Sequence, residues 1–321
     1  MNEAAPAPRK LAIVVAFAAL YLIWGSTYLA IRFAIATIPP LLMAGARFLL
    51  AGLIMYAIAR RQGRERSSLG EWRTAFIIGT CLIFVGNGGV TVSEQWVASG
   101  LASLLVATVP IYIALLGWLS GTAPRPRPLV FLGLAGGFVG VGILVGPALT
   151  ARPGDNLHHV GAGMLVLLFA SLVWSIGSLY SRRTHHSTSP FLSSAQTMLC
   201  GGALTFFAGI ASGEARGFSL RQITPLSLGA FVYLVLVGAI IGYTAYIWLL
   251  RYCDPAKVAT YAYVNPVVAV ALGALFAGEQ LSARTALAAA IIIGSVALVI
   301  TAQQRKEKPG ARLSPVVAQS N

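Results

Sequence analysis

Ten apolar runs dominate the sequence, and each is long enough to cross a lipid bilayer as a helix of about 20 residues. They cover approximately residues 11–31, 40–59, 74–92, 97–119, 128–146, 160–180, 191–211, 226–249, 257–277 and 283–301. Apolar residues occupy 57% of the 321 positions and charged residues only 10%, whereas a soluble domain carries about 25% charged residues. The sequence therefore predicts an all-α, multi-pass membrane protein.

The basic residues are distributed unevenly over the segments between these runs. With the N-terminus on the cytoplasmic side, seventeen Lys and Arg residues fall on that side and five on the other. Positive residues concentrate in the cytoplasmic loops of membrane proteins, so we expect both termini to be cytoplasmic. This asymmetry explains the net charge of +14 without a nucleic-acid partner, which requires a folded basic face.

Several residue pairs recur at nearly constant spacing along the chain. Trp24 and Trp174 are 150 residues apart, as are Gly52 and Gly202, and the spacing is 156 for Gly86 and Gly242 and for Pro110 and Pro266. Each half holds five runs, and an odd number requires the second half to enter the membrane inverted. The predicted fold is ten transmembrane helices in two inverted five-helix repeats, residues 11–146 and 160–301, followed by a disordered cytoplasmic tail at 302–321. Transporters of this architecture bind substrate near the midplane, between the repeats.

Two proline-bearing runs are the most distinctive stretches of the chain. Pro266 follows Asn265 in the middle of the ninth run, where a proline removes a backbone donor and kinks or interrupts a helix. In lipid, such a defect is tolerated only where protein or water faces the freed carbonyls. Pro110 has a similar setting in the fourth run. We predict that Pro110 and Pro266 are helix-break or gating positions beside a polar cavity; the alternative is a packing kink filled by neighbouring side chains.

Charged side chains are nearly absent from the interiors of the runs. Arg47 is the exception, about seven residues into the second run, or roughly 10 Å at 1.5 Å per residue. It is predicted either to bind an anionic group of a substrate or to tie helix-end carbonyls. Glu94 and Glu279 lie near the outer ends of runs; we expect them to be solvated loop charges, with a role as an ion or proton relay as the alternative.

Residues that could support enzymatic chemistry are scattered. All four histidines lie between runs, and the three cysteines have no metal-ligand spacing. Without an embedded nucleophile–base pair or metal cluster, the sequence predicts no catalytic residues, no metal, no cofactor and no enzymatic activity.

Aromatic and small polar side chains gather in the runs that could surround a cavity. The predicted substrate-binding set is Trp24, Ser26, Thr27, Tyr28, Arg47, Asn87, Trp174, Ser178, Gln196, Tyr243, Tyr261, Tyr263 and Asn265. Such a lining suits aromatic or amphipathic solutes, or cations held by ring faces. For any single Ser or Thr, the alternative is a hydrogen bond to its own helix.

Several motifs resemble a known family. They are Ile23–Tyr28, Pro39–Leu49, Gly86–Gly88, Val106–Pro110, Tyr261–Val270 and Gly278–Glu279, and together they resemble the EamA-type ten-helix exporters of the drug/metabolite transporter superfamily. The resemblance spans nearly all of residues 11–301. It implies export of small metabolites or drugs across a bacterial-type inner (plasma) membrane, and a cavity built mainly from spans 1–4 and 6–9 with spans 5 and 10 at the periphery.

The sequence and the resemblance together predict a secondary transporter that exports amino-acid-like or aromatic and amphipathic solutes by alternating access. The alternative is a non-transporting membrane scaffold or a channel component, although neither a charge ring nor a carbonyl filter is present in the sequence. The expected partners are a small-molecule substrate and the lipid bilayer, with a homodimer left open.

The predicted topology can be tested with single cysteines on a cysteine-free background. A membrane-impermeant maleimide should label Asp155→Cys in intact cells and should label Ser67→Cys only after the membrane is permeabilised. Labelling of position 67 from outside, or of position 155 only from inside, would contradict the predicted orientation.

Overall fold

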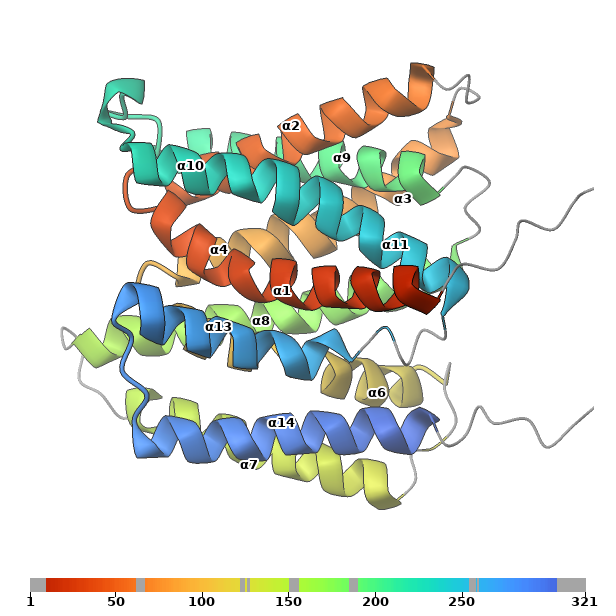
Figure 1. Cartoon of the computed structure of the whole chain (residues 1–321), viewed down its shortest axis with the longest axis vertical. Helices are drawn as coiled ribbons and strands as arrows, with labels where there is room; N and C mark the ends of the chain where they lie inside the picture. Colours follow the sequence, from red (N-terminus) through yellow and green to blue (C-terminus); the bar gives the residue numbers. More distant parts are fainter. Residues whose placement is uncertain are drawn as a thin grey trace, which may run out of the picture.

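The computed structural model describes residues 10–61, 67–121, 125, 128–149, 156–184, 190–253, 258 and 260–304. All the regular secondary structure in these ranges is helical. The helices lie side by side with roughly parallel axes, and the described chain begins and ends at the same end of the bundle (Figure 1). The all-α prediction is confirmed for this part of the chain.

The helices follow the predicted apolar runs closely. They are α1 (Lys10–Ala34), α2 (Pro40–Arg61), α3 (Leu69–Gly79), η1 (Thr80–Asn87), α4 (Gly88–Ser93), α5 (Ser99–Val106), α6 (Val109–Leu119), α7 (Pro128–Leu149), α8 (Asn156–Arg183), α9 (Pro190–Ala211), η2 (Leu220–Gln222), α10 (Pro225–Tyr233), η3 (Leu234–Ile241), α11 (Gly242–Tyr252), α13 (Tyr261–Ala277) and α14 (Ala283–Gln304). The predicted tail lies outside the described residues from position 305 onward.

Seven helical segments are long and apolar enough to cross a membrane, and three shorter apolar helices lie at Pro128–Leu144, Val264–Ala277 and Ala283–Val299. Many large apolar side chains on these segments point outward, including Leu53, Phe207 and Leu275. An apolar exterior of this kind suits contact with lipid tails. These features support a multi-pass membrane protein, while the count of ten spans stays a prediction.

Helices at equivalent positions of the two halves pack against each other. This is so for α2 and α9, for α5 and α13, and for α7 and α14. In Figure 1, α7 and α14 form a pair at one edge of the bundle, and α2 and α9 lie near the opposite edge. The bundle is therefore assembled from contacts between the halves as much as from contacts within each half.

Glycine brings α2 and α9 into close contact. A Cβ atom on Gly45 would lie 2.4 Å from the Phe206 backbone nitrogen, and one on Gly202 would lie 2.8 Å from the Leu49 backbone nitrogen. Helices in lipid associate through such small residues because hydrocarbon tails are as apolar as Leu, so close packing replaces the hydrophobic effect. In α7, Gly133 and Gly140 approach α14 in the same way.

Two π-helical segments interrupt the α-helical geometry at equivalent places. The segment η1 follows α3 and η3 follows α10, and the two start 154 residues apart. In η1 the Asn87 side-chain nitrogen donates to the Leu82 carbonyl, five residues earlier, at 3.2 Å. A π-helical turn widens the helix locally and is frequent at functional sites.

The two proline-bearing runs differ from one another. In the first half, α5 ends at Val106 and α6 starts at Val109, with Pro110 in its first turn, so the predicted helix break is present there. In the second half, α13 runs continuously through Pro266. An interruption of the helix at Asn265 is therefore wrong, and within α13 Pro266 supplies no backbone donor to the Ala262 carbonyl.

The close packing of α2 and α9 predicts that Gly45→Ala lowers stability. The added methyl group must displace the α9 backbone, and overpacking of this kind costs about 1–3 kcal/mol. Thermal unfolding in detergent should show a lower Tm for this variant. Gly229→Ala, whose Cβ would meet no atom within 4 Å, is the matched control and should not lower Tm; an equal effect of both changes would contradict the packing argument.

Candidate functional site

A cavity of about 140 Å³ lies in the interior of the bundle. The predicted residues that line it are Trp24, Thr27, Tyr28, Arg47, Asn87, Trp174, Tyr243, Tyr261, Asn265 and Pro266. Apolar side chains such as Ile31, Val106 and Leu234 complete most of the remaining wall. For comparison, an apolar protein cavity of roughly 150 Å³ holds benzene, so the space suits one aromatic ring or a short aliphatic body.

Helices from both halves build this cavity. The lining residues come from α1, α2, η1, α4, α5, α6 and the break between them, α8, η3, α11 and α13. Among the described residues, α7 and α14 contribute none, which agrees with the peripheral position that the family resemblance implies for spans 5 and 10. The helix α9 also contributes none, so the seventh span differs from that expectation.

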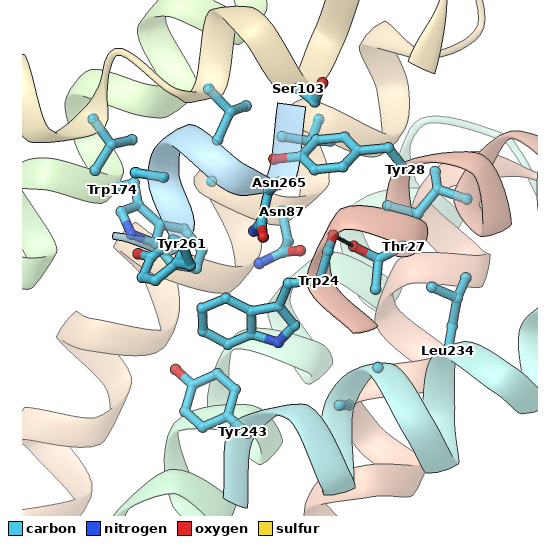
Figure 2. Close-up of a pocket in the computed structure, with 18 of the residues that line it drawn as sticks. Trp24, Thr27, Tyr28, Asn87, Ser103, Trp174, Leu234, Tyr243, Tyr261 and Asn265 are labelled. Carbon is cyan, nitrogen blue, oxygen red and sulfur yellow. Dashed lines mark hydrogen bonds between the residues drawn. The ribbon is translucent and has the colours of Figure 1, made fainter. Parts of the chain in front are cut away.

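An aromatic group forms one side of the cavity. The Trp24 ring centroid lies 5.1 Å from that of Tyr261 in an edge-on contact, 5.2 Å from Tyr246 and 6.2 Å from Tyr243. Figure 2 shows the Trp24 indole with Tyr243 and Tyr261 beside it. Such ring pairs each contribute about 0.5–1.5 kcal/mol beyond burial. The contacts join α1, α11 and α13 and give the cavity a rigid aromatic wall.

The polar side of the cavity centres on Arg47. This residue is only 3% exposed, and its Nη2 donates to the Asn87 Oδ1 at 2.9 Å. Its Cζ lies 4.5 Å from the Phe48 ring centroid, while its Nε is buried without a hydrogen-bond partner. Arg47 lines the cavity, and because an unsatisfied buried donor costs free energy, an acceptor group that bonded to this guanidinium would be stabilising.

Asn87 is held in place by the π-helical segment. Its Nδ2 donates to the Leu82 carbonyl, and its Oδ1 accepts from Arg47. The amide therefore satisfies a backbone carbonyl in η1 and orients the guanidinium at the same time. The side chain connects the irregular backbone to the position of the charge.

Asn265 joins α13 to α1. With its amide oriented to satisfy both bonds, its nitrogen donates to the main-chain carbonyls of Tyr21 and Tyr261, each at 3.3 Å. The residue is buried and lines the cavity. Its contacts position the helix that carries Tyr261, and they occupy the amide nitrogen.

Several predicted residues lie outside the cavity lining. Ser26 donates to the Ile23 carbonyl at 2.9 Å and hydrogen-bonds with the Tyr233 hydroxyl. Ser178 donates to the Trp174 carbonyl at 2.8 Å, so both serines follow the alternative of a bond to their own helix. Gln196 and Pro110 are likewise not in the lining, and the Tyr263 side chain lies outside the described residues.

The cavity also contains residues outside the predicted substrate-binding set. Gly86 precedes Asn87 in η1 and Val90 follows it in α4, and Gly238 and Ala239 belong to η3. The motif Gly86–Gly88 was a usable signal for the first pair. The sequence of η3 is uniformly apolar, so no residue type in it indicated a cavity. The only indication was the 156-residue spacing between Gly86 and Gly242, the residue that follows η3.

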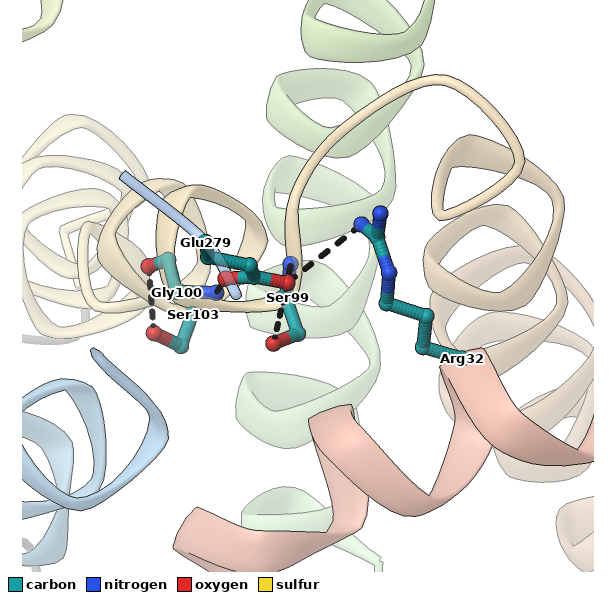
Figure 3. Close-up of polar contacts among 5 residues, drawn as sticks. All are labelled: Arg32, Ser99, Gly100, Ser103 and Glu279. Atoms are coloured by element: carbon teal, nitrogen blue, oxygen red, sulfur yellow. Dashed lines mark hydrogen bonds and ion pairs between the residues drawn. The ribbon is translucent and has the colours of Figure 1, made fainter. Parts of the chain in front are cut away.

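The expectation that Glu279 is a solvated loop charge is wrong. Its side chain is 10% exposed and its Oε1 lies 3.3 Å from the Arg32 Nη1. The carboxylate accepts from the Ser99 nitrogen and hydroxyl at 2.8 Å, and from the Gly100 nitrogen at 3.0 Å. We call this group of Arg32, Ser99, Gly100 and Glu279 the Arg32–Glu279 latch (Figure 3).

Local backbone geometry explains how Glu279 reaches this place. Gly278 ends α13 in the left-handed conformation with φ of 63°, which turns the chain back on itself. The N-terminus of α5 has no side-chain cap of its own, since Ala98 stands at that position. Free backbone N–H groups and the helix dipole favour a carboxylate there. The latch thereby connects the ends of α1 and α13 to the start of α5.

The latch is linked to the cavity through α5. The Ser103 hydroxyl donates to the Gly100 carbonyl at 2.7 Å, and Ser103 also lines the cavity. One helical turn therefore separates the carboxylate of Glu279 from the cavity wall.

Glu94 is also buried, contrary to the expectation of a solvated charge. It is 3% exposed, and neither of its carboxylate oxygens has a hydrogen-bond partner. It interacts electrostatically with Arg47 and with Glu279. The sequence did not suggest this interaction, because Glu94 stands near the end of one apolar run and Arg47 in the interior of another.

A helical bundle with a central aromatic and arginine-lined cavity between its two halves is the architecture of a membrane transporter. The chain belongs to the EamA-like transporter family, whose family model matches residues 11–146 and 161–301, and with it to the drug/metabolite transporter superfamily. The resemblance inferred from the motifs is thereby confirmed.

The relatives point to the same class. The uncharacterized inner membrane transporter YedA of Escherichia coli K12 is 40% identical over 288 residues, which cover 88% of each chain. A probable amino-acid metabolite efflux pump of the same organism is 27% identical, covering 84% of this chain and 89% of its own. A solved crystal structure with 21% identity superposes with a TM-score of 0.62 over 92% of this chain and all of the other, which supports the fold.

The double role of Asn87 predicts a marked loss of stability in Asn87→Ala. The change leaves the Leu82 carbonyl and the Arg47 guanidinium without their partner, and each such buried group costs about 1–3 kcal/mol. Chemical or thermal unfolding of the purified protein would measure this loss. Thr80→Val, which removes one hydroxyl bond to Phe76 on the exposed side of the same segment, should change stability by less than about 0.5 kcal/mol. Equal effects would contradict the assigned role.

Proposed function

We propose that the protein is a secondary transporter that exports small organic solutes across the inner membrane, and that its substrates carry a carboxylate and an aromatic or apolar body. Membership in the EamA-like transporter family supports the transport role. The observation that carries the substrate class is the combination, in one cavity, of the buried Arg47 guanidinium and the rigid aromatic wall around Trp24.

The chemistry of the cavity favours this class over others. A planar guanidinium binds a carboxylate through two parallel hydrogen bonds, and ring faces and edges suit an apolar or aromatic body. The cavity of about 140 Å³ suits a single ring better than a nucleotide sugar. A relative described as a probable amino-acid metabolite efflux pump fits the same substrate class.

We further propose that the ten apolar helices form two inverted five-helix repeats and that the transporter works by alternating access. Three observations support this arrangement: the pairwise packing of equivalent helices, the two π-helical segments 154 residues apart, and the two matches of the family model. In transporters of this kind, the repeats rock about a fixed site near the midplane. On the proposed topology both termini are cytoplasmic and the Arg32–Glu279 latch faces the periplasm.

Transport into proteoliposomes tests the function and the substrate class together. We suggest three labelled probes that share a phenyl ring: L-phenylalanine, 3-phenylpropionate and phenethylamine. The first two carry a carboxylate and should be transported, whereas the amine lacks it and should not. Saturable flux of the amine alone would overturn the carboxylate preference, and no flux of any tested solute would favour the non-transporting scaffold.

Arg47→Ala should lower kcat/KM for a carboxylate probe by more than about tenfold, since a charge-assisted hydrogen bond contributes about 1.5–3 kcal/mol. Arg47→Lys should restore only part of the activity, because the planar fork is lost. Arg73→Ala, which removes an exposed arginine on α3, is the control and should transport normally. Full transport per folded molecule of Arg47→Ala would show that Arg47 is structural.

A further inference from the structure

Glu94 occupies an unusual position that the proposed function does not use. It follows directly on α4, it is 3% exposed, and it is not part of the cavity lining. Both of its carboxylate oxygens are buried without a hydrogen-bond donor. An ionised carboxylate in such surroundings is costly, and the usual outcome is that the group binds a proton instead.

Charged and titratable groups face Glu94 from each neighbouring element. Arg47 comes from α2, Tyr28 and Arg32 come from α1, and Glu279 follows α13. The helix α8 also packs on α4, and its first turn carries His158 and His159. Both imidazoles are exposed, and the His159 ring stacks on Trp96 with ring centroids 6.5 Å apart.

The balance of these interactions favours the neutral acid. Burial, followed by the nearby Glu279 carboxylate, raises the pKa of the Glu94 carboxyl well above its ordinary range, while Arg47 and Arg32 oppose the shift to a smaller degree. The two largest effects have separate geometric causes. The packing of α4 buries Glu94, and the latch holds the Glu279 carboxylate on the Ser99 and Gly100 nitrogens, at the start of the helix that follows Glu94.

We propose that Glu94 is a proton-binding site and that its protonation stabilises the Arg32–Glu279 latch. One proton moves between water and the Glu94 carboxylate, and no other bond changes. In the ionised state, Glu94 repels the Glu279 carboxylate, and movement of Glu279 away from α5 and from Arg32 on α1 relieves that repulsion. In the protonated state the repulsion is absent, and Glu279 keeps its bonds to Ser99, Gly100 and Arg32.

The stability of the Arg32–Glu279 latch should depend on pH, because protonation of Glu94 and closure of the latch are linked. Because the pKa of Glu94 is raised in the latched arrangement relative to a hydrated carboxyl, low pH favours the latch and high pH opposes it. The coupling is reciprocal, so closure of the latch draws a proton from water and its opening releases one. This inference goes beyond the proposed transport function, since it needs no solute and no assignment of substrate.

The first measurement detects the proton directly. Infrared difference spectra of the full-length protein in lipid nanodiscs, recorded against pH, should show a protonated carboxylic acid that ionises at a higher pH than an exposed glutamate does. Glu94→Gln should lose this band. A band that persists unchanged in Glu94→Gln, or the absence of any such band in the wild type, would overturn the assignment.

The second measurement follows the latch. Spin labels at Ala36→Cys and Gln280→Cys, on a background without native cysteines, lie on exposed positions beyond α1 and α13. Pulsed electron resonance should show one short distance at low pH and an added longer distance at high pH, where Glu94 is ionised. Glu94→Gln should keep the short distance throughout, and Arg32→Gln should show the longer distance even at low pH.

Matched variants separate this proposal from its alternatives. His159→Gln should respond to pH as the wild type does; if it abolishes the response while Glu94→Gln retains it, the sensor is the imidazole and the proposal fails. If Glu94→Gln does not fold, Glu94→Asp keeps the carboxyl and should shift the pH midpoint, and an unshifted midpoint would also contradict the assignment. Because neither measurement uses a solute, its outcome is independent of whether the transport assay succeeds.

Discussion

Backbone hydrogen bonding governs what a chain in hydrocarbon can do, because each unpaired N–H or C=O group there costs several kcal/mol. Regular helices meet this requirement, and the described chain departs from them at few places within its apolar segments. The π-helical segments η1 and η3, the break between α5 and α6, and Pro266 are such departures, and all of them line the cavity. The cavity is thus the place where irregular backbone is tolerated, and side chains such as Asn87 satisfy the groups that it frees.

Contacts between distant segments then fix the positions of these irregular elements. Glycines on α2 and α9 allow the two helices to touch along their length, and this contact supports the helix that carries Arg47. At one end of the bundle, carboxylates cap helices from far along the chain: Glu214 accepts from the Leu41 and Leu42 nitrogens at the start of α2, and Glu279 does the same for α5. Each carboxylate joins the end of one helix to the start of another, so a movement that separates these helices must break its hydrogen bonds.

Much of the site could be inferred from residue type and the spacing between repeats. Trp24 and Trp174 were found as an equivalent pair, and both line the cavity. Arg47 was found because a lone charge in an apolar run needs a partner. The roles of the hydroxyl side chains were harder to predict, because a hydroxyl in a helix can bond to its own backbone or face a cavity. Ser26 and Ser178 bond to carbonyls of their own helices and do not line the cavity. Thr27 lines the cavity and also bonds to the Trp24 carbonyl. Gln196 lies on α9 away from the cavity, which no pattern along a single helix reveals.

The sequence by itself determined the membrane class, the helix positions and the two-part organisation, because bilayer thickness and helix geometry set the length of each apolar run and repetition leaves its spacing in the chain. Only the tertiary structure decided the state of the carboxylates. Glu94 and Glu279 stand between apolar runs and look solvated when the chain is taken linearly. The positive φ of Gly278 and the uncapped N-terminus of α5 bring Glu279 inside, and the packing of α4 buries Glu94. The burial and pairing of a charged side chain depend on groups that other parts of the chain bring next to it in the fold, and the local sequence does not contain that information.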